Sequence, residues 1–172
     1  GLIVVGSHVP MSTRQLEHLL RERSLEALEI DVGELPEGAE RIKADLSKRL
    51  ASAHQAGRDA VLYTSRTERT FATAEERLAF GESISKLIME LLREAPENLG
   101  FIISKGGITS NDVLSVGLGL TTARVVGQIH PGCSVVLTPP EHRLGSIPVV
   151  IFPGNVGNDE SITLVYDRFK GA

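Results

Sequence analysis

Short apolar runs alternate with amphipathic stretches along almost the whole chain, and this alternation limits the fold more than any other feature. Strands buried on both faces of a parallel sheet are typically short, nearly continuous apolar runs. Seven such runs occur, at residues 2–5, 25–30, 60–63, 101–104, 125–129, 135–137 and 149–152. The pattern therefore predicts a sheet whose strands are mostly parallel.

The stretches between these runs have the spacing of helices. Ile84, Leu87, Ile88, Leu91 and Leu92 recur at i, i+3, i+4, i+7 and i+8, which is the buried face of a helix. Similar stripes occupy 16–20, 42–53 and 162–169. Strand–helix alternation predicts an α/β fold with three layers, a mostly parallel sheet having helices on both faces.

Two helix starts carry the pattern of a capping box, a Ser or Thr followed three residues later by Gln or Glu. These pairs are Ser12 with Gln15 and Thr73 with Glu76. The segment 121–152 breaks the alternation, since it holds three apolar runs, Pro turns and no helix stripe. We expect a small β excursion with antiparallel pairing there.

Size and charge narrow the class of protein. The chain has 172 residues, of which 41% are hydrophobic, so we expect one folded domain over 1–172. A net charge of −4 with scattered Lys and Arg gives no general electrostatic reason to bind nucleic acid. A single cysteine, Cys133, permits no internal disulfide and fits a cytoplasmic protein.

The start of the chain suggests a piece of something longer. An apolar strand begins at Leu2, and no initiator Met precedes it. We therefore expect a fragment cut near a domain boundary.

Three glycine-containing loops follow predicted strands, at residues 6–8, 105–110 and 153–157. In open α/β sheets, ligands bind beyond the carboxyl ends of the strands. Gly106 and Gly107 let the backbone approach a ligand closely and precede a helix expected near 110–118. Unpaired N–H groups at a helix start attract anions. The loops therefore predict a phosphate site in which the amides of Gly106, Gly107 and Ile108 are the donors.

Polar residues near these loops have alternative interpretations. Thr109 either binds phosphate or caps the helix. Asp112 either lies near a metal or partners the helix dipole. Lys105 either pairs with phosphate or is solvated, and Arg66 either reaches the substrate or another domain or stays on the surface.

Other residues fit structural roles. A lone His8 beside the first loop is interpreted as structural. Cys133 is expected to be a small, partly buried hydrophobe. Residues 139–143 should form an exposed turn, with a domain interface as a further option.

Taken together, several motifs resemble one family. They are Gly6-Ser7-His8, Thr64-Ser65-Arg66, the run 105–112, Gly127-Gln128-Ile129 and the run 152–157. In this order they resemble the C-terminal nucleotide-binding domain of the four-carbon acid sugar kinases, which include threonate, erythronate and 3-oxo-tetronate kinases. The resemblance spans nearly the whole chain.

The resemblance implies a two-domain kinase. The C-terminal domain would hold ATP, and Mg²⁺ would arrive with the nucleotide. An N-terminal sugar-acid domain with an Asp-Asp motif would supply the catalytic residues, so none is expected in this chain. The oligomeric state stays open, with a homodimer as one option. The implied nucleotide contacts are Ser7, Gly106, Gly107, Ile108, Thr109, Gly154, Asn155 and Gly157.

One departure and two alternatives remain. Many relatives have an acidic residue where this chain has Ile108, which a backbone contact tolerates but a side-chain role does not. A non-catalytic module that binds a nucleotide or sugar phosphate is an alternative. An isomerase or aldolase is another, but it would need an acid/base pair in the loops, and Asp112 stands alone there.

Overall fold

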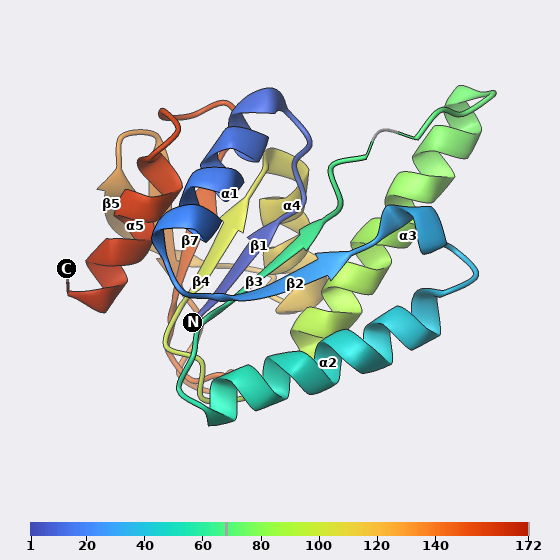
Figure 1. Cartoon of the computed structure of the whole chain (residues 1–172). Helices are drawn as coiled ribbons and strands as arrows, with labels where there is room; N and C mark the ends of the chain where they lie inside the picture. The colour runs from blue at the N-terminus through green and yellow to red at the C-terminus, as the bar shows by residue number, and fades with distance from the viewer. Residues whose placement is uncertain (68, 172) are drawn as a thin grey trace.

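A computed structural model describes residues 1–67 and 69–171. The described residues form a seven-stranded sheet in the order β2-β3-β1-β4-β7-β6-β5 (Figure 1). The strands are β1 Leu2–Val5, β2 Glu26–Ile30, β3 Ala60–Thr64, β4 Ile102–Lys105, β5 Arg124–His130, β6 Cys133–Leu137 and β7 Pro148–Phe152. Each predicted apolar run is a strand, with ends within two residues of those expected.

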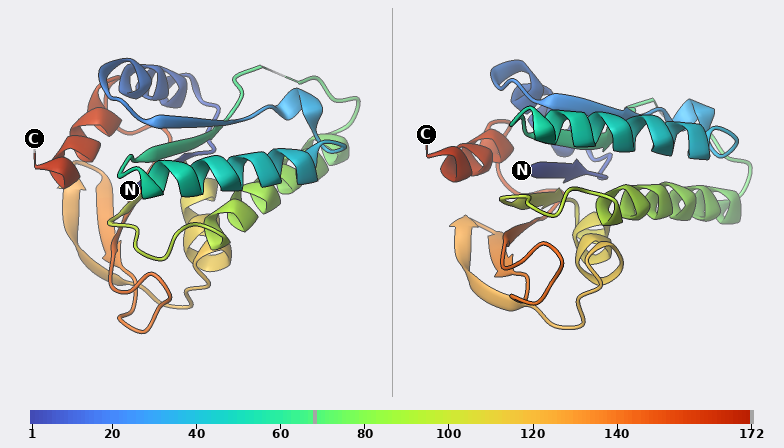
Figure 2. Two further views of the ribbon diagram at one scale, coloured as in Figure 1. Left: turned by 60° about the horizontal axis from the view of Figure 1, so that its bottom comes forward. Right: turned by 90° about the horizontal axis from the view of Figure 1, so that it is seen from below.

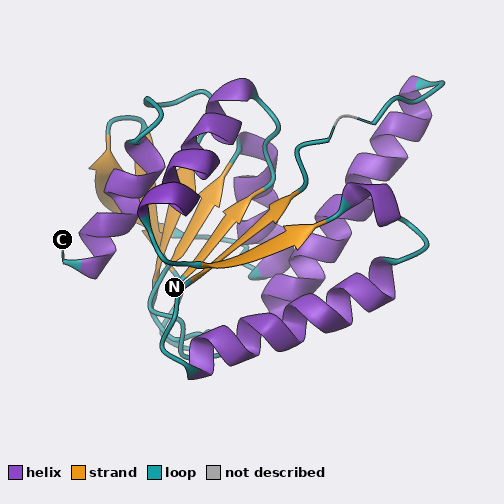
Figure 3. Ribbon diagram, viewed as in Figure 1, coloured by secondary structure: helices purple, strands orange, loops and turns teal. Residues whose placement is uncertain are grey.

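Five neighbouring strands, β2, β3, β1, β4 and β7, are parallel. The last two pairings, of β7 with β6 and of β6 with β5, are antiparallel. The excursion predicted between 121 and 152 is therefore confirmed as two antiparallel strands at one side of the sheet. The parallel strands all end at the same edge, to which their arrowheads point in Figure 3.

Helices cover both faces of the sheet, as predicted. They are α1 Pro10–Glu22, α2 Ala39–Gln55, α3 Ala74–Arg93, α4 Gly107–Asp112 and α5 Ser161–Lys170. A short 3₁₀ helix spans Val32–Glu34, and α4 runs on into a π-helical turn, η2, over Val113–Gly117.

Alternate residues of the strands pack into two separate hydrophobic cores, one on each face of the sheet. Leu2 and Val4 of β1 pack with apolar residues of α2, α3 and η2, whereas Ile3 and Val5 pack with those of α1 and α5. Figure 2 shows α1 and α5 close together, apart from α2 and α3. Consequently the helix that follows β1 and the helix that follows β4 lie on opposite faces.

One predicted capping box is wrong. The helix α1 begins at Pro10, two residues before Ser12, and no side chain caps it. Ser12 Oγ instead donates to Gly154 O at 3.2 Å, and Gln15 Nε2 donates to the carbonyls of Val156 and Asn158 at 3.0 and 2.7 Å. The two side chains therefore tie α1 to the loop after β7.

The second capping box is confirmed with a small shift. Thr73 Oγ1 accepts the N–H of Glu76 at 3.1 Å, and the Glu76 carboxylate accepts the N–H of Ala72 at 3.0 Å. The reciprocal bond thus reaches one residue further back than in the usual box.

The turn at 139–143 is exposed in part and also anchored. Glu141 and Arg143 are exposed, yet the Arg143 guanidinium donates to the carbonyls of Leu92 and Ala95, both at 2.8 Å. These carbonyls lie at the end of α3, where a cation is favourable. Within the described residues, no helix is both long enough and apolar enough to cross a membrane.

The packing of α3 against the sheet leads to a prediction about stability. Leu92 has no exposed surface and packs in the cluster of β1, α2 and α3, so Leu92→Ala should lower the free energy of unfolding by about 2–5 kcal/mol. The matched change Leu164→Ala, at a side chain 46% exposed on α5, should cost less than about 1 kcal/mol. Urea denaturation measures both, and equal losses would contradict this packing.

Candidate functional site

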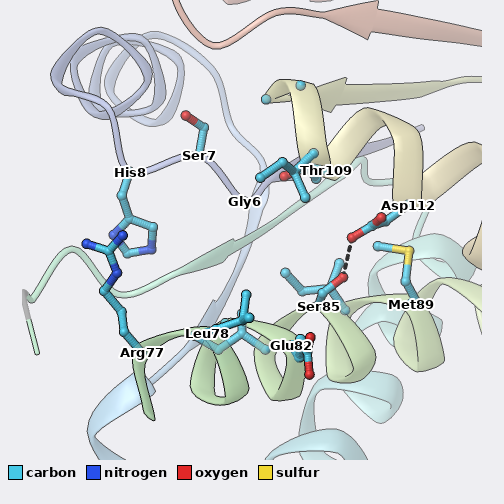
Figure 4. Close-up of a pocket in the computed structure, with 16 residues that line it drawn as sticks. Gly6, Ser7, His8, Arg77, Leu78, Glu82, Ser85, Met89, Thr109 and Asp112 are labelled. Carbon is cyan, nitrogen blue, oxygen red and sulfur yellow. Dashed lines mark hydrogen bonds between the residues drawn. The ribbon is translucent and has the colours of Figure 1, made fainter. Parts of the chain in front are cut away.

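A cavity of about 470 Å³ lies at the carboxyl ends of β1 and β4. These two strands are neighbours, and the helices that follow them diverge to opposite faces, which is where open α/β sheets bind ligands. Three segments line it: the loop after β1 at Gly6–His8, the start of α4 at Gly106–Thr109 with Asp112, and one side of α3 between Arg77 and Met89 (Figure 4).

The three glycine loops converge around Ser7. Gly106 has φ of +118°, which favours glycine, and a Cβ there would lie 3.0 Å from Ser7 Cβ. A Cβ on Gly154 would lie 3.1 Å from Ser7 Oγ, and a Cβ on Gly6 would lie 2.3 Å from Thr109 Oγ1. The backbones therefore approach more closely than other residues would allow, and the expected convergence is confirmed.

The available amides differ from those predicted. The Gly106 N–H donates to Phe152 O at 2.8 Å, so it is part of the sheet and not a free donor. Gly106 is the N-cap of α4, and its carbonyl accepts the N–H of Ser110 at 2.8 Å. The first-turn donors of α4 are then Gly107, Ile108 and Thr109, and no side-chain cap bond occurs there.

The helix after β4 begins at Gly107, three residues before the expected start. Thr109 is therefore inside α4 and does not cap it; its hydroxyl packs against Gly6 and Gly106. Asp112 is likewise beyond the first turn, so it is not the dipole partner that the sequence suggested. Its carboxylate accepts a 2.5 Å hydrogen bond from Ser85 Oγ, which joins α3 to α4 (Figure 4).

Of the two alternatives for Lys105, the solvated one is wrong. Its side chain has no exposed surface, and its ammonium donates to Pro153 O at 2.7 Å and Gly154 O at 3.1 Å. Burial lowers the pKa of Lys105 to about 8. Lys105 thus anchors the start of the third loop, at Pro153 and Gly154, through hydrogen bonds to its carbonyls.

Arg66 supports the first loop in a similar way. Its guanidinium donates to Ser7 O at 2.6 Å and to Val5 O at 3.4 Å, and burial lowers its pKa. His8 Nε2 lies 2.7 Å from Thr64 Oγ1, which fits the structural role expected of it, although His8 also lines the cavity. Cys133 is fully buried, and burial raises the pKa of its thiol to about 11.

The third loop contributes less to the cavity than predicted. Gly154, Asn155 and Gly157 do not line the cavity; Gly154 approaches Ser7, and Asn155 is exposed. Gly157 has φ of +82°, and a Cβ there would lie 2.3 Å from Ser161 Oγ. The turn into α5 therefore explains this glycine without a ligand.

Sequence reasoning missed the wall formed by α3. Leu78, Ile84, Ile88 and Met89 of α3 line the cavity, and Ile108, 81% exposed, lies at its other side. The helical stripe identified Ile84 and Ile88 as core residues, but the same spacing is found whether an apolar residue faces the core or a cavity. Gly81, also in the lining, was the available signal, because a glycine inside a helix costs stability and so often has a functional reason.

Comparison with known families agrees with this geometry. The family described as "Nucleotide-binding C-terminal domain" matches residues 2–162. The chain belongs to this family. The match confirms the resemblance to the C-terminal nucleotide-binding domain of the four-carbon acid sugar kinases. No curated protein matches the chain.

Solved structures share the fold of this nucleotide-binding domain. A domain of unknown function (DUF1537) from Bordetella bronchiseptica, a citrate-bound, domain-swapped dimer, has a TM-score of 0.73 at 15% identity over 98% of this chain. A "putative tRNA synthase" from Salmonella typhimurium LT2 has a TM-score of 0.69 at 21% identity, also over 98%. The chain covers 40% of each of these proteins.

The contact between Gly6 and Thr109 is testable by a double-mutant cycle. Gly6→Ala should lower the free energy of unfolding by about 1–3 kcal/mol, because the new methyl group overlaps Thr109. Adding Thr109→Ala removes the hydroxyl and methyl groups that clash and should restore part of the loss. Chemical denaturation gives the coupling, and additive effects of the two changes would show that the two loops do not touch.

Proposed function

We propose that this chain is the ATP-binding domain of a kinase that phosphorylates a terminal hydroxyl of a four-carbon sugar acid. The observation that carries the proposal is the cavity between β1 and β4, which has backbone donors on one side and an apolar wall on the other. A nucleotide has the same division, an anionic phosphate tail and a flat, largely apolar base. The volume of about 470 Å³ is in the usual range for small-molecule sites, about 300–1,000 Å³.

In this proposal the phosphates lie at the start of α4. The amides of Gly107, Ile108 and Thr109 donate to them, with the Ser7 hydroxyl beside them and Gly154 behind Ser7. Each charge-assisted hydrogen bond contributes about 1.5–3 kcal/mol, so a few of them suffice for a useful site. Phosphoryl transfer depends mainly on positioning and on charge neutralisation, which such a cradle supplies.

The base and ribose then lie against α3. Leu78 and Ile88 form one side of this slot and Ile108 the other. Mg²⁺ would arrive with the nucleotide and would neutralise phosphate charge. Asp112 and Glu82, carboxylates in the lining, would be the residues to hold its water ligands.

The sugar acid and the catalytic base belong, in this proposal, to an N-terminal domain of the same protein. The fold neighbours support it, because this chain covers 40% of their length. The domain-swapped dimer of the Bordetella protein supports a homodimer for this protein also. A cytoplasmic location fits the buried, unpaired Cys133.

The phosphate cradle can be tested at Gly107. A side chain there enters open space at the first position of α4, so Gly107→Asp should fold normally, since an acid near a helix start is favourable. Its charge should repel the phosphates and weaken ATP and ADP binding about tenfold or more, measured by calorimetry. Gly107→Ala is the matched control and should change affinity much less. Unchanged affinity in Gly107→Asp would remove the assignment.

The division of labour between two domains makes a second prediction. This chain alone should bind ATP without transferring phosphate to threonate or erythronate. Joined to the N-terminal domain of a full-length relative, it should transfer the γ-phosphate, as followed by release of ADP and mass increase of the acid. Nucleotide binding without transfer in any such protein would favour the non-catalytic module instead.

A further inference from the structure

Lys105 ends β4 immediately before the Gly106–Gly107 turn, and it is among the largest fully buried side chains of the described residues. Its ammonium makes two hydrogen bonds to the carbonyls of Pro153 and Gly154 and lies 4.1 Å from the centre of the Phe152 ring. All three partners belong to the end of β7 or the turn after it. One cation therefore links the loop after β4 to the loop after β7.

The groups around this ammonium are few. The titratable group that acts on it electrostatically is Cys133 of β6, a thiol whose pKa burial raises to about 11 and which is therefore neutral below that pH. His130 of β5 stacks on Phe152 with ring centres 6.2 Å apart. Among the described residues, no carboxylate forms an ion pair with Lys105.

α1 presents a charged and an uncharged group to the loop after β7, and the charged one, Arg14, forms an ion pair with Asp159 at 2.8 Å. The Ser12 hydroxyl of α1 donates to the same Gly154 carbonyl as Lys105, at 3.2 Å. The Ser161 hydroxyl of α5 meets Gly157. A further cation, Arg66, donates to Ser7 O in the loop after β1. A buried charge without a counter-charge is costly, and an anion above these loops would supply one.

The proton on Lys105 also holds the turn in place. A charge-assisted hydrogen bond is roughly twice as strong as a neutral one, and the attraction of the ammonium to Phe152 exists only in the charged form. Because these bonds fix Pro153 and Gly154, they fix the approach of Gly154 to Ser7.

We propose that Lys105 is a positioning residue that couples a proton to ligand binding: its ammonium holds the Pro153–Gly154 turn against Ser7, so the cavity binds a phosphate-bearing ligand more tightly while Lys105 is charged. The inference rests on the proposed nucleotide site and adds a form of regulation to it. Lys105 acts through the turn and through its field, and it does not touch the ligand.

The sign of the pH dependence follows from linkage. A bound anion favours the ammonium and raises its pKa above the ligand-free value of about 8, so affinity is greatest below pH 8 and falls as the pH rises through it. Stability without ligand changes in the opposite direction. The pKa of Lys105 is lower in the folded chain than its ordinary 10.5, so the unfolded chain holds more protons and folding gains stability from pH 8 upward.

The experiment is calorimetric titration of ADP and of inorganic phosphate between pH 7.5 and 9.5, above the last phosphate ionisation near pH 6 to 7. The unmodified chain should lose about fivefold or more in affinity over this range. Lys105→Met, similar in length but uncharged, should bind weakly with a flat profile. Lys105→Arg stays charged and should also be flat, and it carries the test if Lys105→Met does not fold. Lys48→Met, at an exposed lysine of α2, should behave as the unmodified chain.

A second readout needs no ligand. The amide resonances of Ser7 and Gly154 should shift with a midpoint near pH 8 in the unmodified chain and stay constant in Lys105→Met. Ligand binding with the same pH profile in Lys105→Met would refute the coupling and leave the nucleotide site intact. Resonances that titrate, without binding of either ligand at any pH, would refute the nucleotide site while leaving the hold of Lys105 on the turn.

Discussion

The close approach of three backbone segments at the ends of β1, β4 and β7 is the constraint on which the rest of the structure depends. Ser7 lies among them, and Gly6, Gly106 and Gly154 leave no room there for a larger residue without movement of the neighbours. Protein interiors are packed densely, so such contacts transmit small displacements. The position of each loop is therefore set by the other two, and the cavity keeps its shape without a ligand.

Polar contacts below the loops reinforce this arrangement. Lys105 and Arg66 both donate to loop carbonyls, and Ser12 and Gln15 of α1 donate to the carbonyls of the loop after β7. In the proposed site, the carbonyls of these loops are thus occupied, and the first-turn amides of α4, at Gly107, Ile108 and Thr109, face the anion. An anion site needs this separation, because carbonyl oxygens facing a phosphate would repel it.

Much of the fold could be predicted because it follows from burial. Each buried strand is itself a short apolar run, so it can be recognised in the sequence without knowing which strands pair with it. The start of α4 could not be found in this way, because its N-cap is Gly106, whose conformation at φ of +118° leaves no side-chain signal. The sequence suggested Thr109 as a cap, but in the structure its hydroxyl packs against Gly6 and Gly106.

The same reasoning explains the errors at the site. A lysine beside two glycines suggests solvent or phosphate, and its actual burial depends on Phe152 and on carbonyls almost fifty residues away. The wall of α3 was hidden because Ile84 and Ile88 have the spacing of ordinary core residues. The meeting of the loops at Ser7 and Gly154 could be predicted, since loops after parallel strands meet at one edge.

The conformation of Gly106 makes the passage from strand to helix unusually abrupt. Its N–H still belongs to the sheet, while its carbonyl already opens the first turn of α4, so a single residue serves both elements. No irregular loop therefore separates strand β4 from the N–H groups at the start of α4. Binding there should require little ordering of the backbone, so that little conformational entropy is lost when a ligand arrives.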